Sequence, residues 1–78
     1  MKIKVLFFGR LSDMVQGDDE QLFQNIGNTD ELVKEVQKKY PEFSEYTYKI
    51  AVNHEMISGD RDLKDNDEIA FMPPFAGG

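Results

Sequence analysis

The chain has 78 residues, a net charge of −6, six Phe, three Tyr and no Cys, which is enough for one small folded domain. The absence of Cys excludes disulfide bonds, thiolate metal sites, iron–sulfur ligation and a cysteine nucleophile. The negative charge disfavours binding to nucleic acid and anionic lipid, and it suits a partner with a basic surface. No apolar run is long enough to cross a bilayer and no signal-peptide pattern is present, so we expect a cytoplasmic protein that binds no nucleic acid and no membrane.

The first part of the chain is predicted to form a strand and a short helical turn. Apolar residues alternate with others between Lys2 and Phe8, which is typical of a strand with one buried face. This alternation leaves Phe8 on the face away from the core, and Gly9 ends the strand. A helical turn is expected from Arg10 to Val15. The strand residues expected to face the core are Ile3, Val5 and Phe7.

A second strand and the main helix follow. The strand is predicted from Gln21 to Ile26, and the residues expected on one side of it are Leu22, Gln24 and Ile26. Asn28 or Thr29 can cap the first turn of a helix, and Pro41 ends that helix. The apolar stripe expected on the helix consists of Leu32, Val33, Val36 and Tyr40.

The second half of the chain is predicted to add three strands. The aromatic-rich loop from Phe43 to Tyr48 is expected to cover an edge of the sheet. Strands are predicted at Lys49–Val52, at Met56–Ile57 and at Glu68–Met72, with a turn near Asn66 before the last one. One amphipathic helix must then cover one face of a small mixed sheet, which indicates an α+β fold.

The segment from Met72 to the end is the most informative part of the sequence for function. Two prolines, Pro73 and Pro74, stop the last strand because they cannot donate ladder hydrogen bonds. Gly77 and Gly78 lack a Cβ, so they can enter a channel that is too narrow for other residues. We therefore interpret residues 1–72 as the folded domain and residues 73–78 as a tail whose terminal carboxylate is modified by a partner. The residues expected to thread into that partner are Pro73, Pro74, Phe75, Ala76 and Gly77.

Three apolar residues are predicted to form a partner surface. Phe8 and Met72 are expected on the sheet face away from the helix, and Met56 joins them if its short strand lies alongside. An exposed apolar cluster of this kind usually marks a contact with another protein. The alternative is that the aromatic loop from Phe43 to Tyr48 folds over these residues.

The body of the chain offers little support for catalysis. His54, the only histidine, stands beside Glu55 in a predicted turn, and no nucleophile is in view to complete a catalytic set. The carboxylates of Asp60, Asp62, Asp65 and Asp67 lack the glycine and glutamate positions of a calcium loop, so we interpret them as turn formers and surface charge.

The chain resembles the ubiquitin-like β-grasp sulfur carriers, and most closely the small-subunit family of molybdopterin synthase. Three segments carry the resemblance: the opening strand Lys4–Gly9, the central strand Ile50–Asn53, and the end from Asp67 through Met72-Pro73-Pro74 to Gly77-Gly78. It spans essentially the whole chain, and the final segment is its specific part. Two residues depart from the family pattern, Asn66 where glycine is common and Phe75 where a smaller apolar residue is usual.

The resemblance implies a ubiquitin-like β-grasp fold and a sulfur-transfer mechanism. An ATP-dependent adenylating enzyme would activate the carboxylate of Gly78, and a sulfur-donor protein would convert it to a thiocarboxylate. The tail would then insert into the large subunit of molybdopterin synthase, in an expected heterotetramer, and donate sulfur to a pterin precursor. This chain would be the non-catalytic subunit of that sulfurtransferase; it would bind no cofactor and no metal itself, and ATP would be used by the activating partner.

Three other functions stay open at this point. A sulfur carrier for thiamine-thiazole synthesis would use the same tail chemistry with a different acceptor. A ubiquitin-like protein modifier would need the same activation but a lysine acceptor. A non-covalent interaction module would not need its tail, so deletion of Gly78 would separate it from the others.

Overall fold

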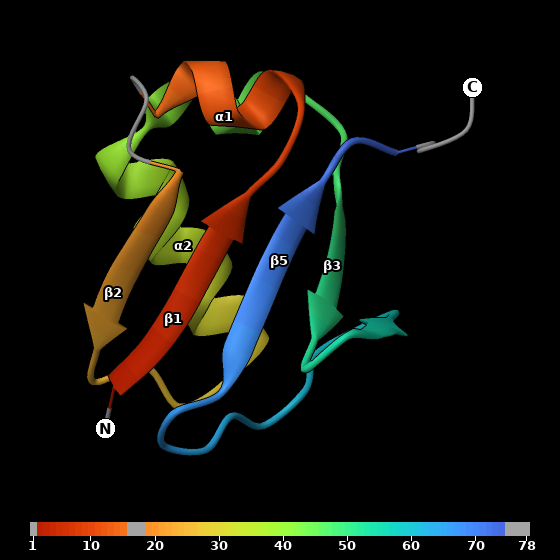
Figure 1. Ribbon diagram of the computed structural model, residues 1–78. Coiled ribbons are helices and arrows are strands. Elements are labelled where there is room, and N and C mark those ends of the chain that lie inside the picture. The colour runs from red at the N-terminus through yellow and green to blue at the C-terminus, as the bar shows by residue number, and fades with distance from the viewer. Residues whose placement is uncertain (1, 16–18, 75–78) are drawn as a thin grey trace.

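The computed structural model of the chain describes residues 2–15 and 19–74 (Figure 1). A five-stranded mixed sheet has its main helix, α2, packed against one face. This arrangement confirms the predicted α+β class and the predicted order of elements. The elements are β1 (Lys2–Phe7), α1 (Arg10–Met14), β2 (Glu20–Gln24), α2 (Thr29–Lys39), the 3-10 helix η1 (Pro41–Glu45), β3 (Lys49–Val52), β4 (Glu55–Ile57) and β5 (Glu68–Met72).

The first and last strands form the centre of the sheet. The strand order is β2-β1-β5-β3-β4, and β1 runs parallel to β5 with Val5 opposite Ile69 and Phe7 opposite Phe71. The other neighbouring strands are antiparallel. Because β5 has a strand on both sides, its backbone direction is fixed up to Met72, from which the chain leaves the sheet.

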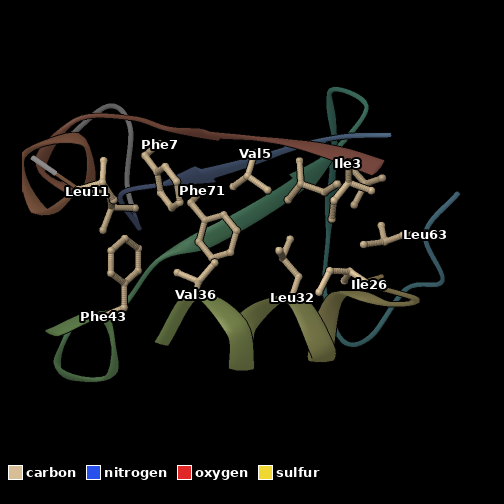
Figure 2. Packing of buried hydrophobic residues seen from close by; sticks show 13 residues of the cluster. Ile3, Val5, Phe7, Leu11, Ile26, Leu32, Val36, Phe43, Leu63 and Phe71 are labelled. Carbon is tan, nitrogen blue, oxygen red and sulfur yellow. The ribbon is translucent and has the colours of Figure 1, made fainter. Parts of the chain in front are cut away.

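The core lies between α2 and the inner face of the sheet, where side chains of β1 and β5 point toward the helix (Figure 2). An aromatic cluster closes one end of it, with the Phe43 ring centroid 5.5 Å from that of Phe7 and the Tyr48 centroid 5.2 Å from that of Phe71. Phe43 comes from η1 and is fully buried. The aromatic loop therefore packs on the inner side of the sheet, and it does not fold over the outer face as the alternative required.

Helix α2 begins with the cap that its sequence predicted. The side chain of Asn28 accepts a hydrogen bond from the backbone N–H of Glu31, and the Glu31 carboxylate accepts one from the backbone N–H of Gly27. This reciprocal pair satisfies two amides near the start of the helix. Within the predicted stripe, Leu32 and Val36 are fully buried, which confirms the face of the helix that was expected to meet the sheet.

Strand β2 carries Leu22 and Gln24 on one side, as predicted, and both are exposed, whereas Ile26, predicted on the same side, is buried. The other side of the strand carries the buried Gln21. Burial of Gln21 is tolerated because its amide donates to the Tyr40 hydroxyl over 2.7 Å and accepts from the Lys39 ammonium over 2.9 Å. Ile26 does reach the core, but from beyond the strand.

The ends of two predicted strands also differ from the structure. Strand β2 stops at Gln24, and Asn25 then takes a left-handed conformation with φ 63°, which redirects Ile26. Strand β1 ends at Phe7, one residue earlier than expected. The turn before β5 is as predicted, since Asn66 has φ 70°.

Candidate functional site

The base of the tail is held by the central strand of the sheet. On β5, Ile69 and Phe71 are fully buried, and the carbonyl of Phe71 accepts a hydrogen bond from the backbone N–H of Phe8 over 3.0 Å. Pro73 and Pro74 follow β5 and are half-buried. The remaining tail residues of the site, Phe75, Ala76, Gly77 and Gly78, lie outside the described residues. Strand β5, which is held on both sides by other strands, thus ends at Met72, where the predicted tail begins.

Gly9 packs directly beneath the first proline of the tail. Its backbone has φ 58° and ψ −134°, a region that favours glycine, and a Cβ at this position would stand 2.8 Å from Cγ of Pro73. Any other residue would therefore need both a strained backbone and a displaced Pro73. The sequence showed Gly9 only as the end of a strand, because its contact with Pro73 depends on the parallel pairing of β1 with β5.

The face of the sheet opposite α2 carries the residues predicted as a partner surface. Phe8 is 46% exposed and Met56 is 52% exposed, whereas Met72 is half-buried. The strand register places Leu6, Ala70, Ala51 and Met56 side by side across β1, β5, β3 and β4. We call this surface the outer apolar patch and define it as Leu6, Phe8, Ala51, Met56, Ala70 and Met72.

The structure brings the three predicted residues to one face but not into one tight cluster. Met72 lies opposite Lys49, one strand away, and Met56 lies on the next strand beyond, opposite Ala51. The patch members that sequence reasoning missed, Leu6, Ala51 and Ala70, have the strand parity that points away from the core. Their alternation was visible in the sequence, but their contiguity depends on the strand order.

The histidine and the aspartates that the sequence analysis considered for catalysis or metal binding lie in turns and at a helix cap. The exposed imidazole of His54 stands 3.2 Å from the Glu68 carboxylate, beside a turn in which Asn53 also has a positive φ. Asp60 caps α2, since it accepts hydrogen bonds from the Thr29 hydroxyl and the backbone N–H of Asp30. Within residues 2–15 and 19–74 no group of three or more His, Asp or Glu side chains is placed to hold a metal ion.

A groove adjoins the base of the tail on the side of α1. It has a volume of about 450 Å³, and its walls include Arg10, Leu11, Tyr46, Pro73 and Pro74. Its lining contains no pair of groups that matches a catalytic acid and base. In the part of the chain that the structure describes, no helix has the length and apolar character that a membrane span requires.

The mixed sheet with one covering helix defines the ubiquitin-like β-grasp class of proteins. The small archaeal modifier protein 1 of Methanosarcina acetivorans has this fold: its solution structure gives a TM-score of 0.81 at 23% identity, over 99% of this chain and 96% of that chain. The model of the ThiS protein family matches residues 5–78 of this chain, so the chain belongs to the ThiS family.

Two relatives named for molybdopterin synthesis match along their full length. The molybdopterin synthase sulfur carrier subunit of Mycobacterium tuberculosis is 33% identical over 82 residues, which cover 100% of this chain and 99% of the relative. A chain from the complex of subunits 1 and 2 of the molybdopterin-converting factor of Helicobacter pylori has a TM-score of 0.75 at 26% identity, with 100% of both chains covered.

Proposed function

We propose that this protein is the sulfur-carrier subunit of a molybdopterin synthase, and that the carboxylate of Gly78 carries the sulfur. The observation that supports this most strongly is the position of Pro73, which follows the central strand β5 and packs against Gly9 at the start of the tail. The names of its full-length relatives point to the same role. A support of this kind holds the start of a tail in place while its end is free to enter another protein.

The chemistry of the tail requires activation by a partner. An α-carboxylate is anionic at neutral pH and is a poor acyl electrophile. In the proposed first step, a carboxylate oxygen of Gly78 attacks the α-phosphorus of ATP, which forms an acyl-adenylate and releases pyrophosphate. In the second step, hydrosulfide released by a donor protein attacks the acyl carbon, the bond to AMP breaks and AMP leaves, and loss of the remaining proton gives a thiocarboxylate on this chain.

The proposed transfer step takes place in the large subunit. From Pro73 to Gly78 the tail reaches at most roughly 20 Å when fully extended, which allows its end to enter a pocket while the folded body stays outside. In this proposal the outer apolar patch docks on the partner, and the net charge of −6 favours a basic partner surface. The two subunits would form a heterotetramer in the cytoplasm, and this chain would contribute no cofactor.

The test is a reconstitution with the adenylating enzyme, ATP and a sulfur donor. Intact-mass and peptide mass spectrometry should show that Gly78 gains the mass of one sulfur less one oxygen. A chain that lacks Gly78 and a Gly77→Val variant serve as controls, because both keep the described domain and alter only the tail. A modification that maps to another residue, or no modification with partners that modify a known carrier, would refute the proposal.

The acceptor is identified in a second stage with the thiocarboxylated protein. Incubation with the large subunit and a pterin precursor should release sulfur into the pterin and regenerate the carboxylate. Transfer of the sulfur to a thiazole precursor would instead indicate a carrier for thiamine-thiazole synthesis. An isopeptide bond from Gly78 to a lysine would indicate a protein modifier.

A further inference from the structure

Among the described residues, strand β2 forms one edge of the sheet, and no other strand of residues 2–15 and 19–74 lies beside its outer backbone groups. The backbone N–H of Phe7 donates to the carbonyl of Asp19 over 2.9 Å, so Asp19 directs its backbone groups toward β1. In an antiparallel ladder, alternate residues point their N–H and C=O groups to opposite sides. The residues of β2 that point their backbone groups outward are therefore Glu20, Leu22 and Gln24.

Beyond Glu20 at its first position, whose carboxylate lies 4.0 Å from the Lys4 ammonium, β2 lacks the devices that usually prevent strands from pairing with other chains. Natural edge strands are protected by charged side chains, prolines, bulges or very short length. Between Glu20 and Asp30 the sequence has no charged residue and no proline. Leu22, at the middle of β2, is 64% exposed, the largest value among the large apolar side chains that are exposed.

The opposite edge of the sheet provides a contrast within the same molecule. Strand β4 has only three residues, and its first residue, Glu55, forms an ion pair with Arg61 at 3.1 Å. Short length and charge are both recognised forms of edge protection. The open character of β2 is therefore a property of that strand and not of the fold as a whole.

We propose that β2 pairs with β2 of a second copy of this chain, antiparallel and about a twofold axis at Leu22. In this register Leu22 faces its own counterpart, and Glu20 of each copy faces Gln24 of the other. All three outward-pointing residues are then opposite one another, so the two strands satisfy each other's backbone groups. The product is a continuous sheet across both copies, and the interface is isologous.

The sequence of β2 selects this register over its neighbours. Outward-pointing residues must face each other, so the register can change only in steps that keep them paired. The smallest such shift, of two residues, places Leu22 opposite Glu20 or opposite Gln24 of the second copy. It removes the Leu22–Leu22 contact and leaves one of the three outward-pointing residues of β2 without a partner in that strand. A shift of four residues places Glu20 opposite Glu20, which is unfavourable, or Leu22 opposite Ile26, which lies beyond the left-handed Asn25 and outside the strand. The register centred on Leu22 is therefore the one that pairs all three residues.

The proposed dimer leaves the candidate functional site open. Strand β1 separates β2 from β5, so the base of the tail lies away from the paired edges. Met56 and Met72 of the outer apolar patch lie on β4 and β5, also away from β2. Leu6 lies opposite Glu20 of β2, but pairing of strand edges extends the sheet sideways and does not cover the face on which Leu6 lies. The inference therefore does not depend on the proposed sulfur chemistry, and an absence of self-association would leave that chemistry unaffected.

The experiment measures self-association of the full chain between micromolar and millimolar concentration. Sedimentation velocity should show a monomer that converts to a dimer as concentration rises. In amide NMR spectra and hydrogen exchange, the N–H groups of Glu20, Leu22 and Gln24 should shift and gain protection with concentration. Those of Gln21 and Phe23, which already face β1, should gain little. A monomer throughout, or shifts that map to another surface, would overturn the proposal.

Charge variants at one exposed position test the register. Gln24→Lys creates two Lys–Glu pairs across the twofold axis and should strengthen association about 2- to 30-fold. Gln24→Glu creates like-charge pairs and should weaken it to a similar extent. Ser58→Lys makes the same change in net charge next to β4, at the opposite edge, and should have little effect. Equal responses to Gln24→Lys and Ser58→Lys would refute the proposed register.

A change at the axis tests the interface itself. Leu22→Lys places two ammonium groups against each other and removes the leucine contact, so it should weaken dimerisation about tenfold or more. Leu22 is exposed in the monomer, so the thermal midpoint measured at low concentration should hardly change. A variant that keeps the stability and the dimerisation of the parent chain would count against pairing through β2.

Discussion

Along β5, Ile69 and Phe71 are fully buried against the helix, whereas Ala70 and Met72 lie on the uncovered face and are half-buried. The same alternation divides β1, where Val5 belongs to the core and Leu6 to the outer apolar patch. The inner face combines large aromatic rings with α2, while on the outer face no helix or strand of the described residues covers the outer apolar patch. One set of strands thus supplies stability on one side and, in our proposal, recognition on the other, and variants on the two faces should have separable effects.

The largest expected effect is on the inner face. Phe71→Ala removes a fully buried ring that contacts Phe7, Phe43 and Tyr48, and it should lower the free energy of unfolding by about 3–5 kcal/mol. Urea denaturation followed by circular dichroism measures this loss. For a domain of this size such a loss is a large part of the total stability. A loss below about 1 kcal/mol would show that the aromatic cluster can collapse around the cavity.

A substitution at Gly9 should disturb the point where the chain leaves the sheet. Gly9→Val should cost about 2 kcal/mol or more, because the side chain meets Pro73 and the backbone is strained. Gly59→Val is the matched control, since Gly59 also has a positive φ (80°) but a Cβ there meets no atom within 4 Å. The difference between the two unfolding free energies measures the contact with Pro73. Equal losses would attribute the whole effect to backbone strain.

On the outer face the expected effect is on binding. Under the proposed function, Phe8→Ala and Met56→Ala should each lower the affinity for the large subunit about tenfold, as truncation of an apolar anchor does. Both side chains are exposed, so the free energy of unfolding should change by less than about 1 kcal/mol. Isothermal titration calorimetry gives the affinity of each variant. Loss of stability with unchanged affinity per folded molecule would place these residues in the core.

The smallest expected effect concerns the helix that covers the inner face. Asn28→Ala removes the cap that accepts from the backbone N–H of Glu31 and should cost about 1 kcal/mol of stability. Asn28→Asp keeps an acceptor at the cap and should retain most of the stability. Thermal unfolding of the three proteins measures the difference. If the aspartate variant lost as much as the alanine variant, the amide would have a role other than capping.

The sequence predicted the elements that obey a simple periodicity and failed where a polar residue is buried. Strand β1, helix α2 and strand β5 were placed correctly because apolar spacing and the Asn28 cap define them. In β2 the sequence grouped Ile26 with Leu22 and Gln24, but Ile26 is buried beyond the end of the strand and the other two are exposed. The buried residue of the strand is the polar Gln21. Gln21 is accommodated through Tyr40 and Lys39, and partners so far along the chain cannot be identified from spacing alone.

The candidate site was predictable in its parts but not in its assembly. The prolines after β5 and the outward parity of Phe8 and Met72 are visible in the sequence, and the structure places them as expected. The contact of Gly9 with Pro73 and the contiguity of Ala51 with Ala70 arise from the pairing of distant strands. The roles of Gly77 and Gly78 stay predictions, since these residues lie outside those that the structure describes.

The parallel pair β1 and β5 joins two segments from opposite ends of the sequence, Lys2–Phe7 and Glu68–Met72. Contacts between residues so distant along the chain form only when the entropy cost of closing a long loop is overcome. The outer apolar patch takes residues from both segments, so a chain that is only partly folded does not display it. If an activating enzyme docks on that surface, sulfur is loaded selectively onto chains that have completed folding. The topology would then ensure that the activating enzyme spends ATP and sulfur only on a carrier that is fully folded.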